Sequence, residues 1–198
     1  MLEVTYMVKN DLKTAREILE NKGFVLSKYA IMSDRYFSKY DDASLKRMPY
    51  QEIIGSSVLL RRIETDTVTN YMIYKNKEYD KNGNVVNEEK VRTKLADFDT
   101  ATKILSKAGL NKFADYITHL YEYKNGSEQV CLQQIDELGL FIEHEEQSYA
   151  EGQTLKEREN NLINNLNRTG LSLGTDPFIK KVELYLNKKF NNTVSEME

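Results

Sequence analysis

Apolar and polar positions alternate along several short segments of the chain, and this two-residue period is typical of half-buried β-strands. Residues 2–8 alternate in this way, and residues 91–95 alternate apolar or hydroxyl side chains with charged ones. The same reading predicts strands at residues 33–38, 57–64, 68–75, 113–123, 128–136 and 139–147. We therefore expect about eight strands joined by short turns, which favours a closed antiparallel barrel or a strongly curved sheet.

Two segments with a helical period share a sequence pattern: DLKTAREILENKGF at residues 11–24 and DFDTATKILSKAGL at residues 97–110. Each begins with a possible N-cap, carries an Ile-Leu pair on an apolar stripe and contains a glycine, Gly23 or Gly109, suited to the helix end. Two interpretations remain open. The similarity is either chance between two amphipathic helices, or the mark of a fold made of two related halves, each with a helix against strands.

The sequence also contains turn signals and predicts two further helices. DKNGN at residues 80–84 and KNGS at residues 124–127 are hairpin signals. Residues 154–168 have helical spacing of apolar residues, and Asp176 followed by Pro177 is typical of an N-cap and the first helical position of another helix. Residues 191–198 have the character of a frayed tail. No interdomain linker is evident in the sequence.

Composition narrows the class of protein. With 40% apolar and 30% charged residues the chain is expected to be globular. Its net charge of -3 argues against nucleic-acid binding driven by bulk positive charge, although a locally basic pocket remains compatible with it. The single cysteine, Cys131, excludes an internal disulfide framework and a cysteine-based zinc cluster. No apolar run is long enough for a signal peptide or a membrane span, so we expect a cytoplasmic protein with no membrane partner.

Basic side chains gather on some of the predicted strands. Lys90, Arg92 and Lys94 share a strand face, and Lys75 ends its strand. Arg61 and Arg62 are adjacent, so they should point to opposite faces and one of them inward. For any single strand, the charged residues are explained by a face exposed to solvent. If helices cover the apolar faces, however, the charged faces line the inside of a barrel, where they are costly unless a ligand or water fills the space.

Carboxylates follow the same alternation near the end of the sheet. In GLFIEHEEQ, residues 139–147, Glu143 and Glu145 fall on one face while Leu140 and Ile142 fall on the other, and Glu3 has a similar place near the N-terminus. A solvated outer face would produce this pattern, and so would a metal site of paired carboxylates. Carboxylate oxygens suit Mg²⁺ or Mn²⁺, and basic side chains suit phosphate oxygens.

Other chemistry is less well supported. His144 lies between the two glutamates and so points away from them, which indicates a packed residue rather than a ligand. His119 is interpreted as an ordinary strand residue. No recognisable motif pairs a serine or cysteine nucleophile with these histidines, and the sequence has neither a P-loop nor a GxGxxG motif.

The order of these features resembles the CYTH superfamily, which includes class IV adenylate cyclases, thiamine triphosphatases and inorganic tripolyphosphatases. The resemblance spans residues 2–146 and rests on an N-terminal acidic strand, a helix, DRYF, LLRRIE, MIYK, a second helix and VCLQQIDELGLFIEHE. It implies an eight-stranded antiparallel tunnel in which basic residues hold a triphosphate. It also implies that Glu143 and Glu145 are inward-facing metal ligands.

The chain departs from the family pattern at several positions. Of the N-terminal E-x-E-x-K only Glu3 remains, and Lys90, Arg92 and Lys94 stand where the family strand usually carries glutamates. Gln133 stands where an acidic residue is expected. Tyr116 and Thr118 lie near the place of the paired basic residues that the family carries before its second hairpin. Lost carboxylates should weaken metal binding, because neutral side chains cannot balance two positive charges as well.

From these observations we expect an α+β fold: an eight-stranded antiparallel tunnel barrel over residues 1–150, with helices outside. Residues 151–190 would be a C-terminal helical extension of the same domain, and residues 191–198 a tail. One functional hypothesis is a metal-dependent enzyme acting on a nucleoside triphosphate, thiamine triphosphate or tripolyphosphate, by hydrolysis or cyclisation. In it Glu3, Glu143 and Glu145 hold Mg²⁺ or Mn²⁺. The phosphates contact a basic set comprising Arg61, Arg62, Lys75, Lys90, Arg92 and Lys94.

The alternative hypothesis is a binding protein that kept the tunnel and lost catalysis. The excess of lysine and arginine over the usual glutamates on the strand from Lys90 to Lys94 favours an anion even without metal. A third hypothesis makes the barrel a scaffold whose surface binds another protein. The oligomeric state is left open, a homodimer included.

Overall fold

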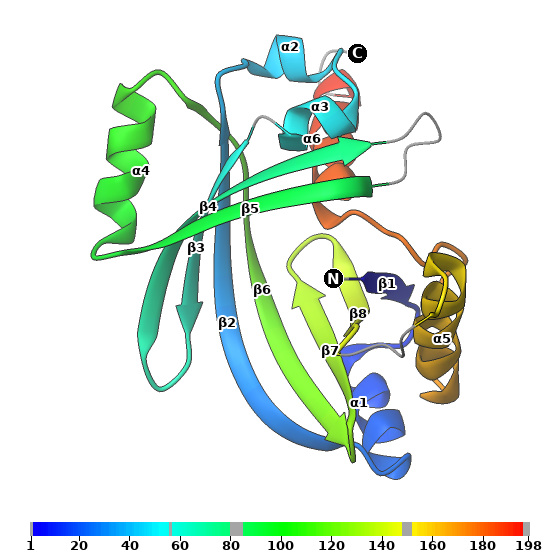
Figure 1. The fold of residues 1–198 in the computed structure, drawn as a ribbon. Coiled ribbons are helices and arrows are strands. Elements are labelled where there is room, and N and C mark those ends of the chain that lie inside the picture. The colour runs from blue at the N-terminus through cyan, green and yellow to red at the C-terminus, as the bar shows by residue number, and fades with distance from the viewer. Residues whose placement is uncertain (1, 56, 80–84, 148–151, 196–198) are drawn as a thin grey trace. The chain divides into compact units, whose positions relative to one another are not determined.

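The computed structural model describes residues 2–55, 57–79, 85–147 and 152–195 (Figure 1). The strands are β1 Glu3–Val8, β2 Val25–Ser38, β3 Val58–Glu64, β4 Val68–Tyr79, β5 Val85–Leu95, β6 Asn111–Asn125, β7 Glu128–Ile135 and β8 Gly139–Glu145. The helices are α1 Leu12–Asn21, α2 Asp42–Leu45, α3 Tyr50–Gly55, α4 Phe98–Lys107, α5 Leu155–Arg168 and α6 Lys181–Ser195. Among the described residues, no helix is both long and apolar enough to cross a membrane.

The eight strands form one sheet in the order β1-β8-β7-β6-β2-β3-β4-β5. The β1–β8, β8–β7, β7–β6, β2–β3, β3–β4 and β4–β5 pairs are antiparallel. The predicted α+β class with eight antiparallel strands is therefore confirmed. The KNGS signal is confirmed as the β6–β7 turn, where Gly126 adopts a φ of 59°. The DKNGN signal lies outside the described residues, between the ends of the paired strands β4 and β5.

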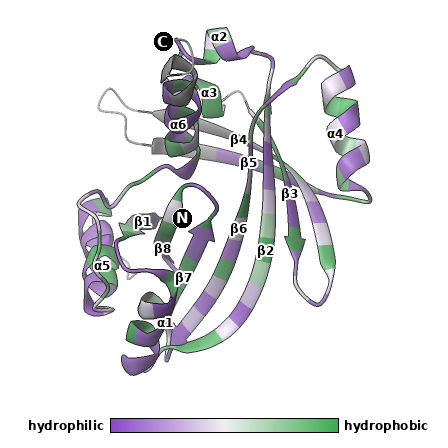
Figure 2. Cartoon of the chain, turned by 180° about the vertical axis from the view of Figure 1, so that it is seen from behind, coloured by the Kyte–Doolittle hydropathy of each residue, from purple (hydrophilic) through white to green (hydrophobic). Residues whose placement is uncertain are grey.

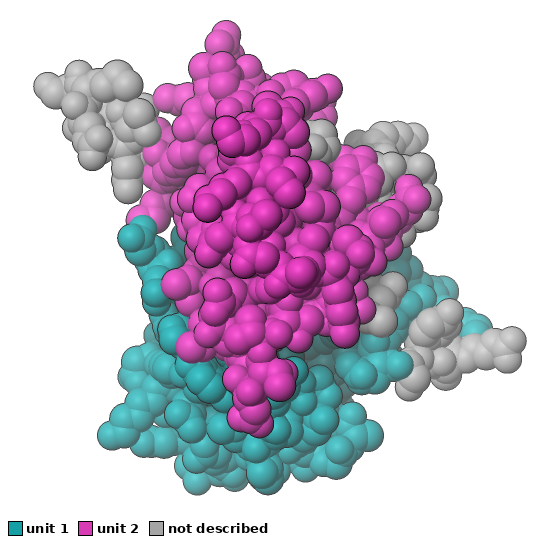
Figure 3. Space-filling view, turned by 90° about the vertical axis from the view of Figure 1, so that its left-hand side faces the viewer, with its two compact units in different colours: residues 1–30, 118–181 teal, residues 31–117, 182–198 magenta. Residues whose placement is uncertain are grey.

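The chain divides into two compact units, coloured separately in Figure 3. Unit 1 comprises residues 1–30 and 118–181, and unit 2 comprises residues 31–117 and 182–198. The long strands β2 and β6 contribute residues to both units. The predicted boundary at residue 150 stays a prediction.

Unit 1 buries the apolar face of β1, β7 and β8 under α1 and α5. Its core includes Val4, Leu132 and Ile142 from the strands, together with Leu19 and Leu166 from the helices. Each of these side chains is fully buried. Helix α5 begins at a capping box, in which the Thr154 and Glu157 side chains satisfy each other's backbone N–H groups. Figure 2 shows α5 as mostly hydrophilic with a few hydrophobic positions, and Leu162 and Leu166 are the ones that are buried.

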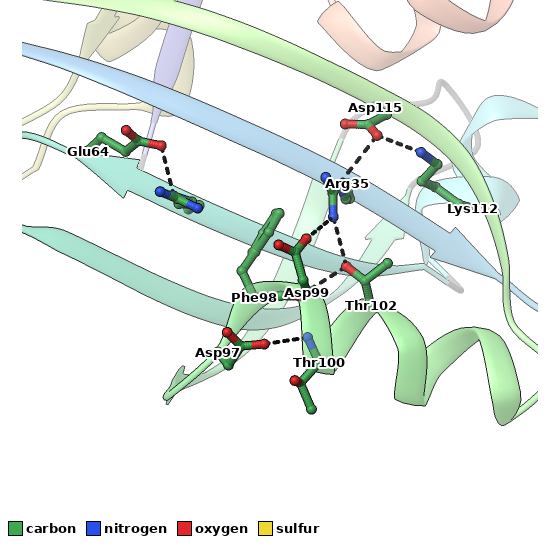
Figure 4. Close-up of polar contacts among 10 residues, drawn as sticks. Arg35, Glu64, Asp97, Phe98, Asp99, Thr100, Thr102, Lys112 and Asp115 are labelled. Carbon is green, nitrogen blue, oxygen red and sulfur yellow. Dashed lines mark hydrogen bonds and ion pairs between the residues drawn. The ribbon is translucent and has the colours of Figure 1, made fainter.

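Unit 2 packs α4 against one face of its own strands. Phe37 and Leu60 contact Phe98, Ala101 and Leu105 of the helix in one core cluster. The Arg35 guanidinium fixes α4 further. Its Nη1 donates to Asp99 Oδ1 at 2.9 Å and to Thr102 Oγ1 at 3.1 Å, and it lies over the Phe98 ring (Figure 4).

The two helices of the internal repeat begin and end alike. Asp11 caps α1 by accepting from the Thr14 backbone N–H, and Asp97 caps α4 by accepting from the Thr100 backbone N–H. Gly23 and Gly109 follow the helix ends with φ of 85° and 86°, a region that favours glycine. The predicted caps and helix ends are thus confirmed in both copies, and each helix lies against a sheet face of its own unit.

Other predicted boundaries were wrong. The last helix begins at Lys181 and not at Asp176, because Phe178 bridges to Thr5 and the intervening backbone hydrogen-bonds to β1. The same helix continues to Ser195, into the predicted tail. Strands β2, β4, β5 and β6 are longer than their alternation indicated, since neighbouring strands stabilise segments that lack a clear two-residue period. The short helices α2 and α3 were not predicted.

Candidate functional site

One face of unit 2 collects most of the predicted basic residues. The register places Asp34, Arg61, Tyr71 and Lys94 directly opposite one another across β2, β3, β4 and β5. The next row on the same face contains Tyr36, Leu59, Ile73 and Arg92, and beyond it Lys75 pairs with Lys90. Because side chains alternate along a strand, Arg61, Arg92, Lys94 and Lys90 share this face, which we call the basic face.

Arg61 is held by a buried carboxylate. Its Nε donates to Asp34 Oδ1 at 2.7 Å and its Nη2 to Oδ2 at 2.6 Å, so the pair is bidentate. The Asp34 side chain is 4% exposed and that of Arg61 is 29% exposed. Burial alone would lower the pKa of Arg61, but the charge and hydrogen bonds of Asp34 outweigh it and raise this pKa. Two donors of Arg61 are therefore committed to Asp34, which leaves less of its charge for an anion.

A series of tyrosine rings begins beside the ion pair. The ring of Tyr36 lies 6.2 Å from that of Tyr116, which in turn lies 5.8 Å from that of Tyr185 in α6. Burial raises the pKa of Tyr116 well above its usual value, and the charges of Tyr36 and Asp34 act in the same direction. Tyr116 is therefore a neutral hydroxyl at the position near which the family resemblance implies a basic residue.

A small pocket opens on the same face. It has a volume of about 90 Å³ and is lined by Tyr36, Tyr50, Ile54, Ser57, Leu59, Ile73 and Val182. Helices α3 and α6 contribute Tyr50, Ile54 and Val182 to its wall. Sites for small organic ligands usually enclose about 300 Å³ or more. This pocket is therefore too small to enclose a nucleotide.

The β5 side of the basic face is open to solvent. Lys90, Arg92 and Lys94 are all exposed. The Arg92 guanidinium lies 4.8 Å from the centre of the Tyr71 ring, a cation–π contact that fixes its position above the sheet. The backbone of Lys75 stands directly opposite Lys90, so three exposed cations and a fourth basic position lie on two adjacent strands.

Arg62 does not join this group. It pairs in register with Ser33 and Asn70 and so lies on the opposite sheet face, the one that α4 covers. Its Nε lies 2.8 Å from Glu64 Oε1 of the same strand. The expectation that the two adjacent arginines point to opposite faces is confirmed, and Arg61 is the member on the basic face.

The predicted metal ligands lie in unit 1, on the sheet face opposite its apolar core. Glu3 pairs with Glu145 and Thr5 with Glu143 across β1 and β8. Glu3 and Glu145 are exposed, and the side chain of Glu143 is 18% exposed. Thr5 Oγ1 donates to Glu3 Oε1 at 3.2 Å. The structure thus places the three glutamates on one face, which we call the carboxylate cluster.

A residue that the sequence analysis did not select completes this cluster. Lys181 Nζ lies 2.7 Å from Glu143 Oε2 and 2.8 Å from Gln133 Oε1. Gln133 Nε2 donates to the same Glu143 oxygen at 3.0 Å. Lys181 sits in a helical, mixed-charge segment far from Glu143 in sequence, so no local pattern indicates the contact.

The donor set of the carboxylate cluster is a poor fit for a divalent ion. Among the described residues, no three Asp, Glu, His or Cys side chains come close enough together to hold a metal ion. The Glu143 oxygen facing Gln133 is already bound by an ammonium group. A divalent cation there would be repelled by the lysine charge and would meet a neutral amide where a carboxylate is needed. The three glutamates therefore do not fit a shared metal ion in this arrangement.

The surroundings of the two histidines and of Cys131 do not favour a role as metal ligand or nucleophile. His144 is buried on the apolar face, where burial lowers its pKa and favours the neutral ring. A ring nitrogen of His119 hydrogen-bonds the Tyr29 hydroxyl at 2.7 Å. Burial, with the Glu143 charge acting in the same direction, raises the pKa of the Cys131 thiol to about 12, so it is not a nucleophile at neutral pH.

Comparisons with known proteins bear on the fold. No protein-family model and no curated protein matches the chain. Among solved structures, the PH1819 protein of Pyrococcus horikoshii matches with a TM-score of 0.68 and 17% identity, over 94% of this chain and 99% of that one. A candidate adenylate cyclase from Vibrio parahaemolyticus matches with a TM-score of 0.64 and 17% identity, over 93% and 96% of the two chains. The fold is shared.

A third matching structure is that of a protein for which an activity is described. The candidate adenylyl cyclase from Hippeastrum, for which a dominant triphosphatase activity is described, matches with a TM-score of 0.60 and 13% identity. The match covers 94% of this chain and 95% of that one. At such low identity the likeness establishes the fold and leaves the activity to be argued from the site. The observed eight-stranded sheet has the number of strands that the CYTH resemblance implies.

Proposed function

We propose that this chain binds a triphosphate-class anion on the basic face of unit 2, and that binding rather than turnover is its function. The observation that carries the proposal is the exposed series Lys90, Arg92 and Lys94 on one face of β5. An arginine offers a planar fork to phosphate oxygens and a lysine offers a point charge, so the series suits an extended polyanion such as tripolyphosphate or a nucleotide triphosphate tail.

Two basic positions stand directly opposite each other in the strand register of this face. Lys75 pairs with Lys90 across β4 and β5, and Arg92 follows two residues later on β5. A concentration of positive charge on one strand attracts an anion. Lysines also protect an edge strand from pairing with other chains, and β5 stands at the end of the strand order. The two roles differ in one measurable property, the affinity for a polyanion.

A metal-dependent triphosphatase or adenylate cyclase-like enzyme is the second candidate. The specific observation that favours it is the fold shared with the Hippeastrum protein, for which triphosphatase activity is described. It requires Glu3, Glu143 and Glu145 to hold Mg²⁺ or Mn²⁺. The poor fit of that cluster to a metal ion places this candidate second.

Isothermal titration calorimetry with tripolyphosphate, ATP and thiamine triphosphate, in EDTA and in Mg²⁺, tests the proposal. We expect binding in EDTA to at least one of them. Reversing two charges, Arg92→Glu with Lys94→Glu, should weaken it by about a hundredfold, since each lost phosphate contact is worth roughly 1–1.5 kcal/mol. Lys28→Glu, at an exposed strand position of unit 1, is the matched control and should leave the affinity unchanged.

The same samples separate the two candidates. Phosphate, pyrophosphate and cyclic nucleotide release are measured in parallel with Mg²⁺ or Mn²⁺ present. Metal-dependent turnover that is lost in the folded Glu143→Gln, Glu145→Gln variant would establish the enzyme and overturn the binding-only proposal. Equal affinities of the wild type and the β5 charge-reversal variant would remove the basic face as the binding surface.

A further inference from the structure

The segment before α6 lies along the free edge of β1 in unit 1. The Lys9 N–H donates to Ser172 O at 2.8 Å, the Gly174 N–H to Met7 O at 2.8 Å and the Thr5 N–H to Pro177 O at 2.9 Å. This ladder satisfies backbone groups of β1 that a sheet edge otherwise exposes. It also fixes the path of the chain up to Lys181, whose side chain reaches the carboxylate cluster.

The contacts of Lys181 form a closed ring of three groups. The Lys181 ammonium donates to the Glu143 carboxylate and to the Gln133 carbonyl oxygen, and the Gln133 amide nitrogen donates to the same carboxylate oxygen. Each of the three is thus both a partner of the other two and oriented by them. The Lys181 and Glu143 side chains are only 20% and 18% exposed, so solvent screens their attraction less than at an open surface.

We infer that Lys181 is a built-in cation that takes the place of a divalent metal ion at the carboxylate cluster, so that unit 1 carries its own counter-charge and needs no metal. The neutral Gln133 belongs to the same arrangement. A carboxylate at its position would add a negative charge that one ammonium could not balance, whereas an amide both donates to Glu143 and accepts from Lys181. This inference concerns unit 1 alone and does not depend on anion binding by unit 2.

Thermal unfolding of Lys181→Met with and without Mn²⁺ tests the inference. Removing the ammonium takes a charged hydrogen-bond partner from the half-buried Glu143, so we expect the Tm in EDTA to fall by several degrees. Millimolar Mn²⁺ should then restore roughly half of that loss or more, because an added cation can replace the missing charge. The wild type and the charge-retaining Lys181→Arg should show no such Mn²⁺ response.

A double variant shows whether the Mn²⁺ response of the Tm arises at Glu143. Lys181→Met with Glu143→Gln removes both charges, so its Tm should recover relative to Lys181→Met and should not respond to Mn²⁺. If Lys181→Met does not fold in EDTA, Mn²⁺-dependent folding supports the inference.

The inference is overturned by an equal Mn²⁺ response in the wild type and Lys181→Met, or by no response in Lys181→Met while the double variant is folded. The triphosphate affinity of these variants is measured in a separate experiment. That affinity bears on the proposed function of unit 2, whereas the Mn²⁺ response of the Tm bears on the role of Lys181 in unit 1.

Discussion

The Arg61 guanidinium and the Asp34 carboxylate form a bidentate pair across β3 and β2, with both N–O distances at 2.7 Å or below. Directly opposed in register, they begin the row that ends at Lys94 on β5. This pair makes the inner part of the basic face nearly neutral and leaves the outer part, on β5, positive. The division explains why the exposed cations, and not Arg61, are the first choice as phosphate contacts.

Asp34→Asn should destabilise the protein by about 2 kcal/mol. It leaves the Arg61 charge without its counter-charge, and the estimate is below the usual cost for a fully buried pair because the arginine is partly exposed. Chemical unfolding at neutral pH measures the difference. Asp66→Asn, at an exposed turn position, is the control and should stay within about 0.5 kcal/mol of the wild type. Equal stabilities of the two variants would contradict this account.

Acid should weaken the cap of α4. The Thr100 hydroxyl and backbone N–H both donate to Asp97 and hold the pKa of this carboxyl below its usual 3.8. The folded state therefore binds a proton less readily than the unfolded state, and the contribution of Asp97 is present above about pH 4 and is lost as the pH falls through the folded pKa.

The neutral cap Asp97→Asn tests this linkage. Its stability should decline less than that of the wild type between pH 5 and pH 3, a window set on either side of the usual carboxyl pKa. Urea unfolding at several pH values provides the measurement. Parallel pH profiles of the two proteins would show that the cap does not contribute in this way.

Adjacent positions on α4 should respond very differently to truncation. Leu105 is 8% exposed and contacts the unit 2 core, whereas Ile104 is 60% exposed. Leu105→Ala should cost about 2–4 kcal/mol through lost burial and a cavity, and Ile104→Ala about 0.5 kcal/mol or less. The free energy of unfolding of both variants decides the point, since comparable losses would place α4 differently on the sheet.

Tyr71→Leu should weaken triphosphate binding without removing a charge. The Tyr71 ring holds the Arg92 guanidinium in place. Without the ring, Arg92 is ordered only when the anion binds, and the lost conformational entropy reduces the binding free energy. We expect roughly a threefold to tenfold weaker affinity by calorimetry in EDTA. The affinity should also fall with added salt in both proteins, because the contacts are between exposed charges. An unchanged affinity would mean that Arg92 does not contact the anion.

Local pattern by itself determined much of this protein. Alternation located the eight strands, and the caps and glycines of the repeat located α1 and α4, because hydrogen bonds within a few residues fix these features. Alternation also assigned Glu143 and Arg92 to the charged faces of their strands. These properties depend on neighbours in the sequence, so they can be read without knowing what lies opposite.

Only the tertiary structure decided which charges meet. Asp34 and Arg61 are far apart in the sequence and become partners through the β2–β3 register. Lys181 reaches Glu143 because the chain before it pairs with the edge of β1, and that same pairing delayed the start of α6 beyond the predicted cap at Asp176. Strand register and edge pairing couple distant segments, and no local period of apolar residues encodes which partner a side chain will face.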